Sequence, residues 1–281
     1  MTEPNRQSGE KEERIIEIEI ERLRPFKEHL FQVKDDKEMF LLQESIEKYG
    51  ILNPLIVRPV PDGYYEIISG HRRKHAAEKL GYRKVPVIIR VLSEDDSILS
   101  MVDSNLHRER ISYSEKAFAY KLKNDVLKRK SGRKKSQVDH KTPRKRSIDI
   151  ISEDCGDSPK QVQRYISLTK LIPEMLQKLD DEIISFCPAV EIAALSEKEQ
   201  KELLVAMEYA QAIPSLSQAQ RIRQLSKEKQ LSLEKMEEIM CEVKKGEITR
   251  VAFTNEQLHK YFPNSYTPAM MKREILALLK L

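Results

Sequence analysis

The chain is 281 residues long, with 34% charged residues, 6% aromatic residues and no tryptophan. This length allows two domains with real cores, and the composition suits a helix-rich soluble protein more than a large sandwich or barrel. The three cysteines lie far apart without metal-ligand spacing, which argues against a zinc site or a disulfide framework and indicates reduced thiols. The first 14 residues are polar and no apolar run approaches membrane length, so we expect no signal peptide, no membrane contact and a cytoplasmic location.

The net charge of +5 is unevenly distributed along the chain. Residues 1–120 carry a net charge of −2, residues 121–170 carry +9, and residues 171–281 carry −2. A basic band between weakly acidic flanks is typical of a nucleic-acid contact, because such a band neutralises phosphates. Taken alone, the charge run also fits a solvated linker.

Residues 1–14 have the pattern of a disordered tail, and residues 15–110 that of an α+β domain. Alternating or short apolar runs predict strands over residues 15–20, 55–57, 64–68 and 85–92. The turn Pro61-Asp62-Gly63 predicts a hairpin between the second and third of these strands. Helical spacing predicts a helix over 39–49 that Gly50 ends, and Pro86 indicates a sheet edge or the start of a strand.

Residues 67–81 form the most informative stretch of this first part. They predict a strand end, a turn at Gly70, and a helix that Gly81 ends. Arg72 and Arg73 then lie in the first helical turn, where free N–H groups and the helix dipole attract anions. Cations oppose the dipole there, so the two arginines indicate an anionic partner such as a phosphate. A solvated basic helix end is the alternative interpretation.

Residues 111–250 are expected to be helical, beginning with a capping box of Ser112 and Glu115. Residues 128–146 contain glycine, proline and many basic side chains, and cannot bury a core. We therefore expect a flexible basic loop that lies along DNA phosphates. The candidate phosphate-binding residues are Lys134, Lys135, Arg144, Lys145 and Arg146.

Residues 147–166 predict a helix-turn-helix. A short helix precedes Gly156, and Ser158 with Pro159 gives a strong start to the second helix. The outward-facing residues suited to DNA contact are Ser158, Lys160, Gln161, Gln163 and Arg164. Any two short helices around a glycine share this spacing, but the basic segment upstream favours DNA binding.

The rest of the chain is predicted to be helical, and residues 171–250 hold no constellation that suggests catalysis. Further capping boxes are expected at Ser196 with Glu199, Ser217 with Gln220, and Thr254 with Gln257. Residues 251–281 form a short helical C-terminal segment that is a candidate for oligomerisation.

Three segments, together with the helix-turn-helix, resemble the ParB family of partition proteins, in particular its conjugative-element and plasmid branch. Residues 50–54 are similar to the family's Gly-x-x-Gln-Pro motif, with Asn53 in place of Gln. Residues 70–76 resemble its Gly-Glu-Arg-Arg-x-x-Ala motif, and residues 104–108 resemble its Glu-Asn-x-x-Arg motif. The resemblance implies an α+β N-terminal domain like those of ParB and sulfiredoxin, an all-α helix-turn-helix domain and a short helical C-terminal segment.

The resemblance also implies a function. Such proteins bind a centromere-like palindrome in double-stranded DNA as homodimers, and CTP with magnesium closes the dimer into a clamp. A ParA-type ATPase moves the complex, which is nucleoid-associated and serves chromosome, plasmid or mobile-element segregation. The implied nucleotide-binding residues are Gly50, Asn53, Pro54, Gly70, His71, Arg72, Arg73, Ala76, Asn105 and Arg108.

Two departures from the family pattern concern the metal and hydrolysis. His71 replaces the glutamate of the phosphate motif, and Ser104 replaces a metal-binding glutamate. Asp103 and Asn105 are then the candidate magnesium ligands, although one residue along a helix turns a side chain by about 100°. We therefore expect CTP binding with weak or absent hydrolysis.

Two other classes stay open at this point. A helix-turn-helix transcriptional regulator would use the same DNA-reading residues without nucleotide gating. A nucleotide-dependent small-molecule kinase or a sulfiredoxin-like enzyme is less consistent with the sequence. A kinase has no need of a helix-turn-helix, and sulfiredoxin needs a cysteine where this chain has Gly70.

Overall fold

The structure is a computed structural model that describes residues 14–27, 31, 33, 35–106, 108, 111–133, 145–242, 253–263 and 265–278. The chain divides into two compact units, Met1–Met240 and Cys241–Leu281. The predicted disordered tail lies almost entirely outside the described residues. The domain boundaries that we place from the sequence remain predictions.

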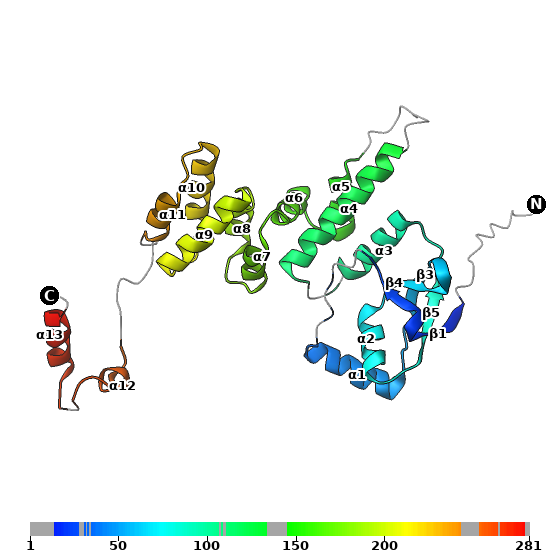
Figure 1. The fold of residues 1–281 in the computed structure, drawn as a ribbon, viewed down its shortest axis with the longest axis horizontal. Coiled ribbons are helices and arrows are strands. Elements are labelled where there is room, and N and C mark those ends of the chain that lie inside the picture. The colour runs from blue at the N-terminus through cyan, green and yellow to red at the C-terminus, as the bar shows by residue number, and fades with distance from the viewer. Residues whose placement is uncertain are drawn as a thin grey trace, which may run out of the picture. The chain divides into compact units, whose positions relative to one another are not determined.

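Strands within residues 14–106 form one mixed five-stranded sheet in the order β1-β5-β3-β4-β2 (Figure 1). The strands are β1 Ile15–Glu19, β2 Leu23–Pro25, β3 Leu55–Pro59, β4 Tyr65–Ser69 and β5 Lys84–Ile89. A short 3-10 helix, Ile20–Arg22, joins β1 to β2. The predicted hairpin is confirmed, because β3 and β4 pair antiparallel around a second 3-10 turn, Pro61–Gly63.

Strand β5 lies inside the sheet, antiparallel to β1 and parallel to β3. Pro86 is its third residue, so the prediction of an edge or strand-start position is wrong. The parallel pairing with β3 begins at Val87, opposite Leu55, so the missing N–H of Pro86 falls just before that ladder. The sequence shows that residue 86 has no backbone N–H donor, but not which neighbouring strand would have accepted a hydrogen bond from it.

Three helices accompany this sheet: α1 Lys37–Tyr49, α2 His71–Lys79 and α3 Glu94–Leu106. Helices α2 and α3 pack on it, and α1 packs on α2. Gly50 ends α1 with φ 71°, and Asp36 begins it by accepting a 2.8 Å hydrogen bond from the Met39 amide. The sheet core is fully buried at Leu55, Val57, Ile67, Val85 and Val87.

The remainder of the first unit is helical, which confirms the predicted order of an α+β domain followed by helices. The helices are α4 Tyr113–Arg133, α5 Ser147–Cys155, α6 Pro159–Leu168, α7 Pro173–Asp180, α8 Phe186–Ile192, α9 Glu197–Ala210, α10 Leu216–Lys227 and α11 Leu233–Met240. An apolar cluster that includes Ile68 of β4, Met101 of α3 and Val126 of α4 connects the sheet to these helices.

Most predicted capping boxes are confirmed, but one is displaced. Ser112 with Glu115 and Ser196 with Glu199 form as expected. The box predicted at Ser217 and Gln220 is wrong, because Ser215 and Gln218 form it two residues earlier. The sequence offers the Ser-x-x-Gln spacing twice, and burial of Gln218 selects the earlier one.

The basic loop was predicted over residues 128–146, but this predicted start is too early. Helix α4 continues through Arg133, because its last turns are held on α3 by ion pairs. Arg129 pairs with Asp95 at 3.2 Å, and Lys130 pairs with Asp96. Residues 134–144 lie outside the described residues.

The second unit contains α12, Asn255–Leu258, and α13, Pro268–Leu278. The predicted cap of α12 is confirmed by mutual hydrogen bonds of Thr254 and Gln257. Met271 of α13 is buried, whereas Leu278 is exposed. Oligomerisation through this unit stays a prediction.

Candidate functional site

The turn between β4 and α2 is built around Gly70. Its φ is 107°, and an added Cβ would lie 2.8 Å from Leu55 Cγ and 3.3 Å from Arg73 Nη2. Such contacts and such a φ exclude an ordinary side chain. The backbone therefore passes closely over Leu55 and leads directly into the first turn of α2, whose N–H groups have no partner within the helix.

Arg73 joins this turn to the segment that follows α1. Its Nη1 donates hydrogen bonds to the carbonyl oxygens of Pro54, at 2.9 Å, and of Asn53. Burial lowers the pKa of its guanidinium. The structure thus brings Asn53, Pro54, Gly70 and Arg73 together, as the sequence motifs predict for an anion cradle.

Two further arginines place more positive charge beside α2. Arg72 pairs at 3.2 Å with both Asp36 and Glu38, which lie at the start of α1. The pKa of Arg108 is lowered first by burial and then by the charge of Arg72. An anion bound beside Arg108 would offset the repulsion that Arg72 exerts on it. The sequence did not indicate Asp36 and Glu38, which hold Arg72 in place.

Asn105 supplies an unused acceptor near the end of α3. Its side chain is only 3% exposed, and its Nδ2 donates to the Met101 carbonyl oxygen at 2.7 Å. Its Oδ1 has no hydrogen-bond partner among the described residues. A buried acceptor without a partner is costly, so a ligand donor would satisfy it.

The other predicted nucleotide-binding residues have different surroundings. Gly50 caps α1, and His71 is buried at the start of α2. Ala76 is fully buried with Met39 and Ile46, so its small side chain lets α2 pack on α1. A contact of Ala76 with nucleotide stays a prediction.

The cradle fits phosphates better than it fits a metal. Asp103 accepts a 2.7 Å hydrogen bond from Lys123, and Ser104 Oγ donates within its own helix to Met101. Within the described residues, no cluster of three or more metal-binding side chains occurs. Magnesium binding through Asp103 and Asn105 remains a prediction.

Helices α5 and α6 form the predicted helix-turn-helix (Figure 1). Gly156 ends α5 with φ 74°, and Ser158 Oγ begins α6 by accepting a 3.2 Å hydrogen bond from the Gln161 amide. Ile151 and Val162 are fully buried between the two helices and their neighbours. The local signals in the sequence therefore identify this motif correctly.

The exposed face of α6 differs from the prediction at one residue. Ser158, Lys160 and Gln163 are exposed, and Gln161 is half-buried. Arg164 does not face outward, because its guanidinium lies 4.9 Å from the ring centroid of Phe186 and donates to Cys187 Sγ at 3.0 Å. Helix α8 supplies both contacts, and the sequence did not show that α8 packs beside α6.

The described residues of the basic segment are engaged with carboxylates of α5. Lys145 pairs with Glu153 at 2.7 Å, and Arg146 pairs with Asp149 at 2.9 Å. Lys134, Lys135 and Arg144 lie outside the described residues. Exposed pairs of this kind contribute little to stability, so phosphates can replace their carboxylates.

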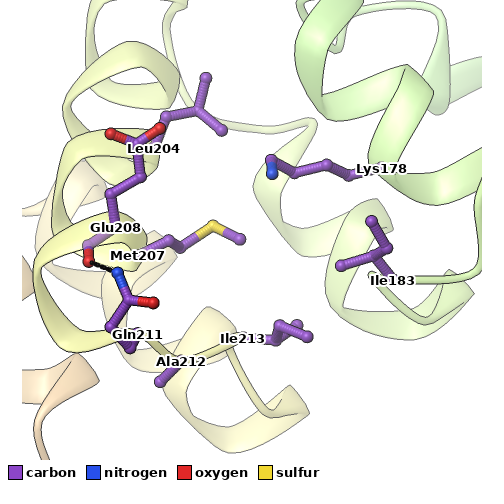
Figure 2. Close-up of a pocket in the computed structure, with 8 residues that line it drawn as sticks. All are labelled: Lys178, Ile183, Leu204, Met207, Glu208, Gln211, Ala212 and Ile213. Atoms are coloured by element: carbon purple, nitrogen blue, oxygen red, sulfur yellow. Dashed lines mark hydrogen bonds between the residues drawn. The ribbon is translucent and has the colours of Figure 1, made fainter.

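A separate pocket of about 200 Å³ lies between α7 and α9. Figure 2 shows Lys178 and Ile183 on one side, and Leu204, Met207 and Glu208 on the other. Gln211 donates to the Glu208 carbonyl oxygen at 2.6 Å on the same wall. None of the predicted site residues lines this pocket.

The fold and the site define a class: an α+β domain with a candidate anion cradle around Gly70, followed by a helix-turn-helix. Residues 4–106 match the family model of the ParB N-terminal domain. The chain is 35% identical over 136 residues to the nucleoid occlusion protein of Bacillus mycoides (strain KBAB4). That alignment covers 46% of this chain and 47% of the relative, so the chain spans about half the length of the relative it matches.

Solved structures of ParB from Caulobacter crescentus are also similar to the chain. The one complexed to the centromeric parS site is 24% identical, covers 80% of this chain and 98% of its own, and has a TM-score of 0.45. The one complexed with CTP-gamma-S is 27% identical, covers 65% and 93%, and has a TM-score of 0.32. In the described part of this chain, none of the helices has the length and apolar character needed to span a membrane.

Proposed function

We propose that this chain is a site-specific DNA-binding partition protein that CTP converts into a closed dimeric clamp. The observation that carries the proposal is the presence of the anion cradle around Gly70 and the helix-turn-helix α5–α6 in one chain. The match of residues 4–106 to the ParB N-terminal domain supports it. The similarity to nucleoid occlusion proteins supports action on the nucleoid.

In this proposal the cradle binds the triphosphate of CTP. Free N–H groups of the first turn of α2 face the phosphates, and Arg72, Arg73 and Arg108 neutralise their charge. Asn105 Oδ1 accepts a hydrogen bond from the ligand. Bound CTP supplies negative charge that allows Arg72 and Arg108 to lie close together.

Weak or absent hydrolysis follows from the residues available for a metal. Ser104 stands where the family has a carboxylate, and the carboxylate of Asp103 is paired with Lys123. Magnesium prefers carboxylate and phosphate oxygens, so its retention here would depend mainly on the phosphates. CTP would then act as a binding signal rather than as a substrate.

The DNA contact is assigned to α6 and the basic segment before α5. Lys160 and Gln163 are exposed on α6 and suit contacts with base edges in a major groove. Two copies of the chain would contact the two halves of a centromere-like palindrome. A ParA-type ATPase as the partner follows from the family resemblance.

Calorimetric titration of the full chain with each of the four ribonucleoside triphosphates tests the nucleotide site. We expect CTP to bind best and Arg72→Ala to weaken binding at least tenfold. The control Arg83→Ala, an exposed arginine just before β5, should bind CTP like the wild type. Equal loss in both variants, or no binding of CTP by the wild type, would reject the cradle as the nucleotide site.

A transcriptional regulator without nucleotide gating is the second candidate, because the helix-turn-helix alone would support it. Amine-reactive crosslinking of the dimer, with and without CTP and DNA, separates the two. A clamp should crosslink more efficiently when both CTP and DNA are present. Unchanged crosslinking, with DNA binding intact, would favour the regulator.

A further inference from the structure

Lys123 lies in the middle of α4 and is almost fully buried, with 2% of its surface exposed. Its Nζ donates hydrogen bonds to Asp103 of α3 and to Asp154 of α5, each at 2.7 Å. One ammonium group therefore joins the last turns of the α+β domain to the first helix of the helix-turn-helix. This contact is independent of the capping and apolar contacts described above.

The positive charge of Lys123 is needed to hold the carboxylates of Asp103 and Asp154 close together. Burial by itself lowers the pKa of its ammonium group, but the hydrogen bonds to both carboxylates outweigh burial and raise it overall. The two carboxylate oxygens are at most about 5.4 Å apart, because each lies 2.7 Å from the same nitrogen. Without the lysine, these two carboxylates would repel each other and separate α3 from α5.

The two carboxylates belong to different parts of the protein: Asp103 lies on α3, beside the cradle, and Asp154 lies on α5, in the helix-turn-helix. Asp103 lies two residues before Asn105 and five before Arg108, so it moves with the α3 side of the cradle. Asp154 precedes Ser158, the cap of α6, and α5 is held to α4 again where Ser147 Oγ donates to Asn124 Oδ1 at 2.6 Å. Ion pairs of Arg129 and Lys130 hold α4 on the start of α3, whereas Asp103 lies at the other end of α3, beside Asn105. Lys123 and Asp154 are therefore the fixed side of the contact, and the end of α3 with Asp103 is the side that a ligand can displace.

We propose that Lys123 is a positioning residue that transmits occupancy of the anion cradle to the helix-turn-helix through Asp103. The inference rests on the proposed nucleotide site. When a triphosphate engages Asn105 and Arg108, the end of α3 shifts and Asp103 leaves Lys123. Lys123 then pairs with Asp154 alone, and α5 changes its position on α4.

Hydrogen–deuterium exchange of the full chain, with and without CTP and magnesium, tests this. In the wild type, CTP should slow exchange in α2 and change it in α5, residues 147–155. Asp154→Asn keeps the Lys123–Asp103 pair, changes none of the proposed nucleotide or metal ligands, and is the main variant; Lys123→Met is the second. Asp125→Asn is the matched control, because Asp125 is exposed on the same helix.

We expect Asp154→Asn to retain the protection of α2 by CTP. Its response in α5 should be at least about fivefold smaller than that of the wild type, a typical size for coupling between sites. Asp125→Asn should behave as the wild type. A full α5 response in both Asp154→Asn and Lys123→Met would overturn the inference. Protection of α2 without any α5 response in the wild type would overturn it and leave the nucleotide site standing. Absence of α2 protection would overturn the nucleotide site, and the coupling with it.

Discussion

The guanidinium of Arg73 lies directly against Gly70, so that a Cβ on the glycine would be 3.3 Å from Arg73 Nη2. The same guanidinium donates to the Pro54 carbonyl oxygen. A single side chain thus connects two sequence motifs that lie on either side of β3 and β4. Any enlargement of residue 70 must displace either this arginine or Leu55, and with it one wall of the cradle.

Gly70→Ala is therefore expected to damage both stability and CTP binding. The left-handed φ of 107° and the close contact with Leu55 should reduce the free energy of unfolding by about 1–3 kcal/mol. Urea denaturation and calorimetric titration measure the two effects. Gly81→Ala is the matched control, since Gly81 also has a positive φ, of 77°, but has nothing within 4 Å of the added Cβ. Similar loss of CTP binding in both variants would show that the contact with Arg73 is unimportant.

A second prediction concerns which α6 residues read DNA. Gln163 is exposed, whereas Arg164 is held by Phe186 and Cys187. Gln163→Ala should cost about 1–3 kcal/mol of binding free energy at one base position and relax specificity there. The measurement is fluorescence anisotropy on a duplex that the wild type selects from a random pool, with variants of that duplex at each position.

The comparison variants for this prediction are Arg164→Ala and Lys170→Ala. Arg164→Ala should change thermal stability more than base preference, because its guanidinium packs on α8. Lys170, exposed beyond the end of α6, should leave both properties unchanged. If Arg164→Ala removes a single base preference while Gln163→Ala removes none, then Arg164 leaves α8 when DNA binds.

The sequence predicted the features that depend on local signals. Gly50 and Gly156 end helices at the predicted positions because a positive φ is required there, and Ser158 caps α6 through its own hydroxyl group. The hairpin around Asp62 follows from turn-forming residues between two apolar runs. The residues of the cradle were predicted from short motifs, because these motifs resemble those of the ParB family.

Contacts between elements that are distant in the sequence were not predictable in this way. The sequence gives only a weak indication that Lys123 is buried and paired. Ala119, Tyr120 and Val126 form an apolar stripe at helical spacing, and Lys123 is the charged residue within that stripe. Its partners Asp103 and Asp154 lie on other helices, and no local pattern pairs them. The orientation of Arg164 depends in the same way on α8, which begins more than 20 residues later.

A third prediction concerns stability at low pH. Asp157, in the turn of the helix-turn-helix, accepts hydrogen bonds from Tyr120 Oη at 2.6 Å and Lys116 Nζ at 2.8 Å. Burial raises the pKa of its carboxyl group, but these two partners outweigh burial and lower it overall. Since the folded pKa lies below the unfolded value of about 3.9, the contribution to stability is complete above about pH 5 and is lost as the pH falls through the folded pKa.

Asp157→Asn should therefore reduce the free energy of unfolding at pH 7 by about 1.5–3 kcal/mol, the usual range for hydrogen bonds to a charged group. It should also flatten the decline in stability below pH 5, measured by urea denaturation at a series of pH values. Tyr120→Phe, which removes one donor and keeps the ring, should have a smaller effect of the same sign. A decline with pH that is unchanged in Asp157→Asn would assign acid sensitivity to other carboxylates.

The fourth prediction separates phosphate contacts from base reading. Replacing Lys134, Lys135, Arg144 and Lys145 by Gln should weaken binding to selected and scrambled duplexes by the same factor. The slope of log K against log salt concentration should fall by about 0.9 for each phosphate that the variant no longer neutralises, because fewer counterions are released. Lys145 is paired with Glu153 in the free protein and must exchange this partner for a phosphate, so its share of the change should be smaller.

The control for this last experiment is a variant with the same change in net charge elsewhere. Lys198, Lys201, Lys227 and Lys229 are exposed on or just after α9 and α10, away from the helix-turn-helix sequence. Their replacement by Gln should leave the salt slope close to that of the wild type. A slope that falls equally in both variants would mean that overall charge attracts the DNA. A fall confined to the first variant would place the basic segment on the phosphates, leaving sequence recognition to α6.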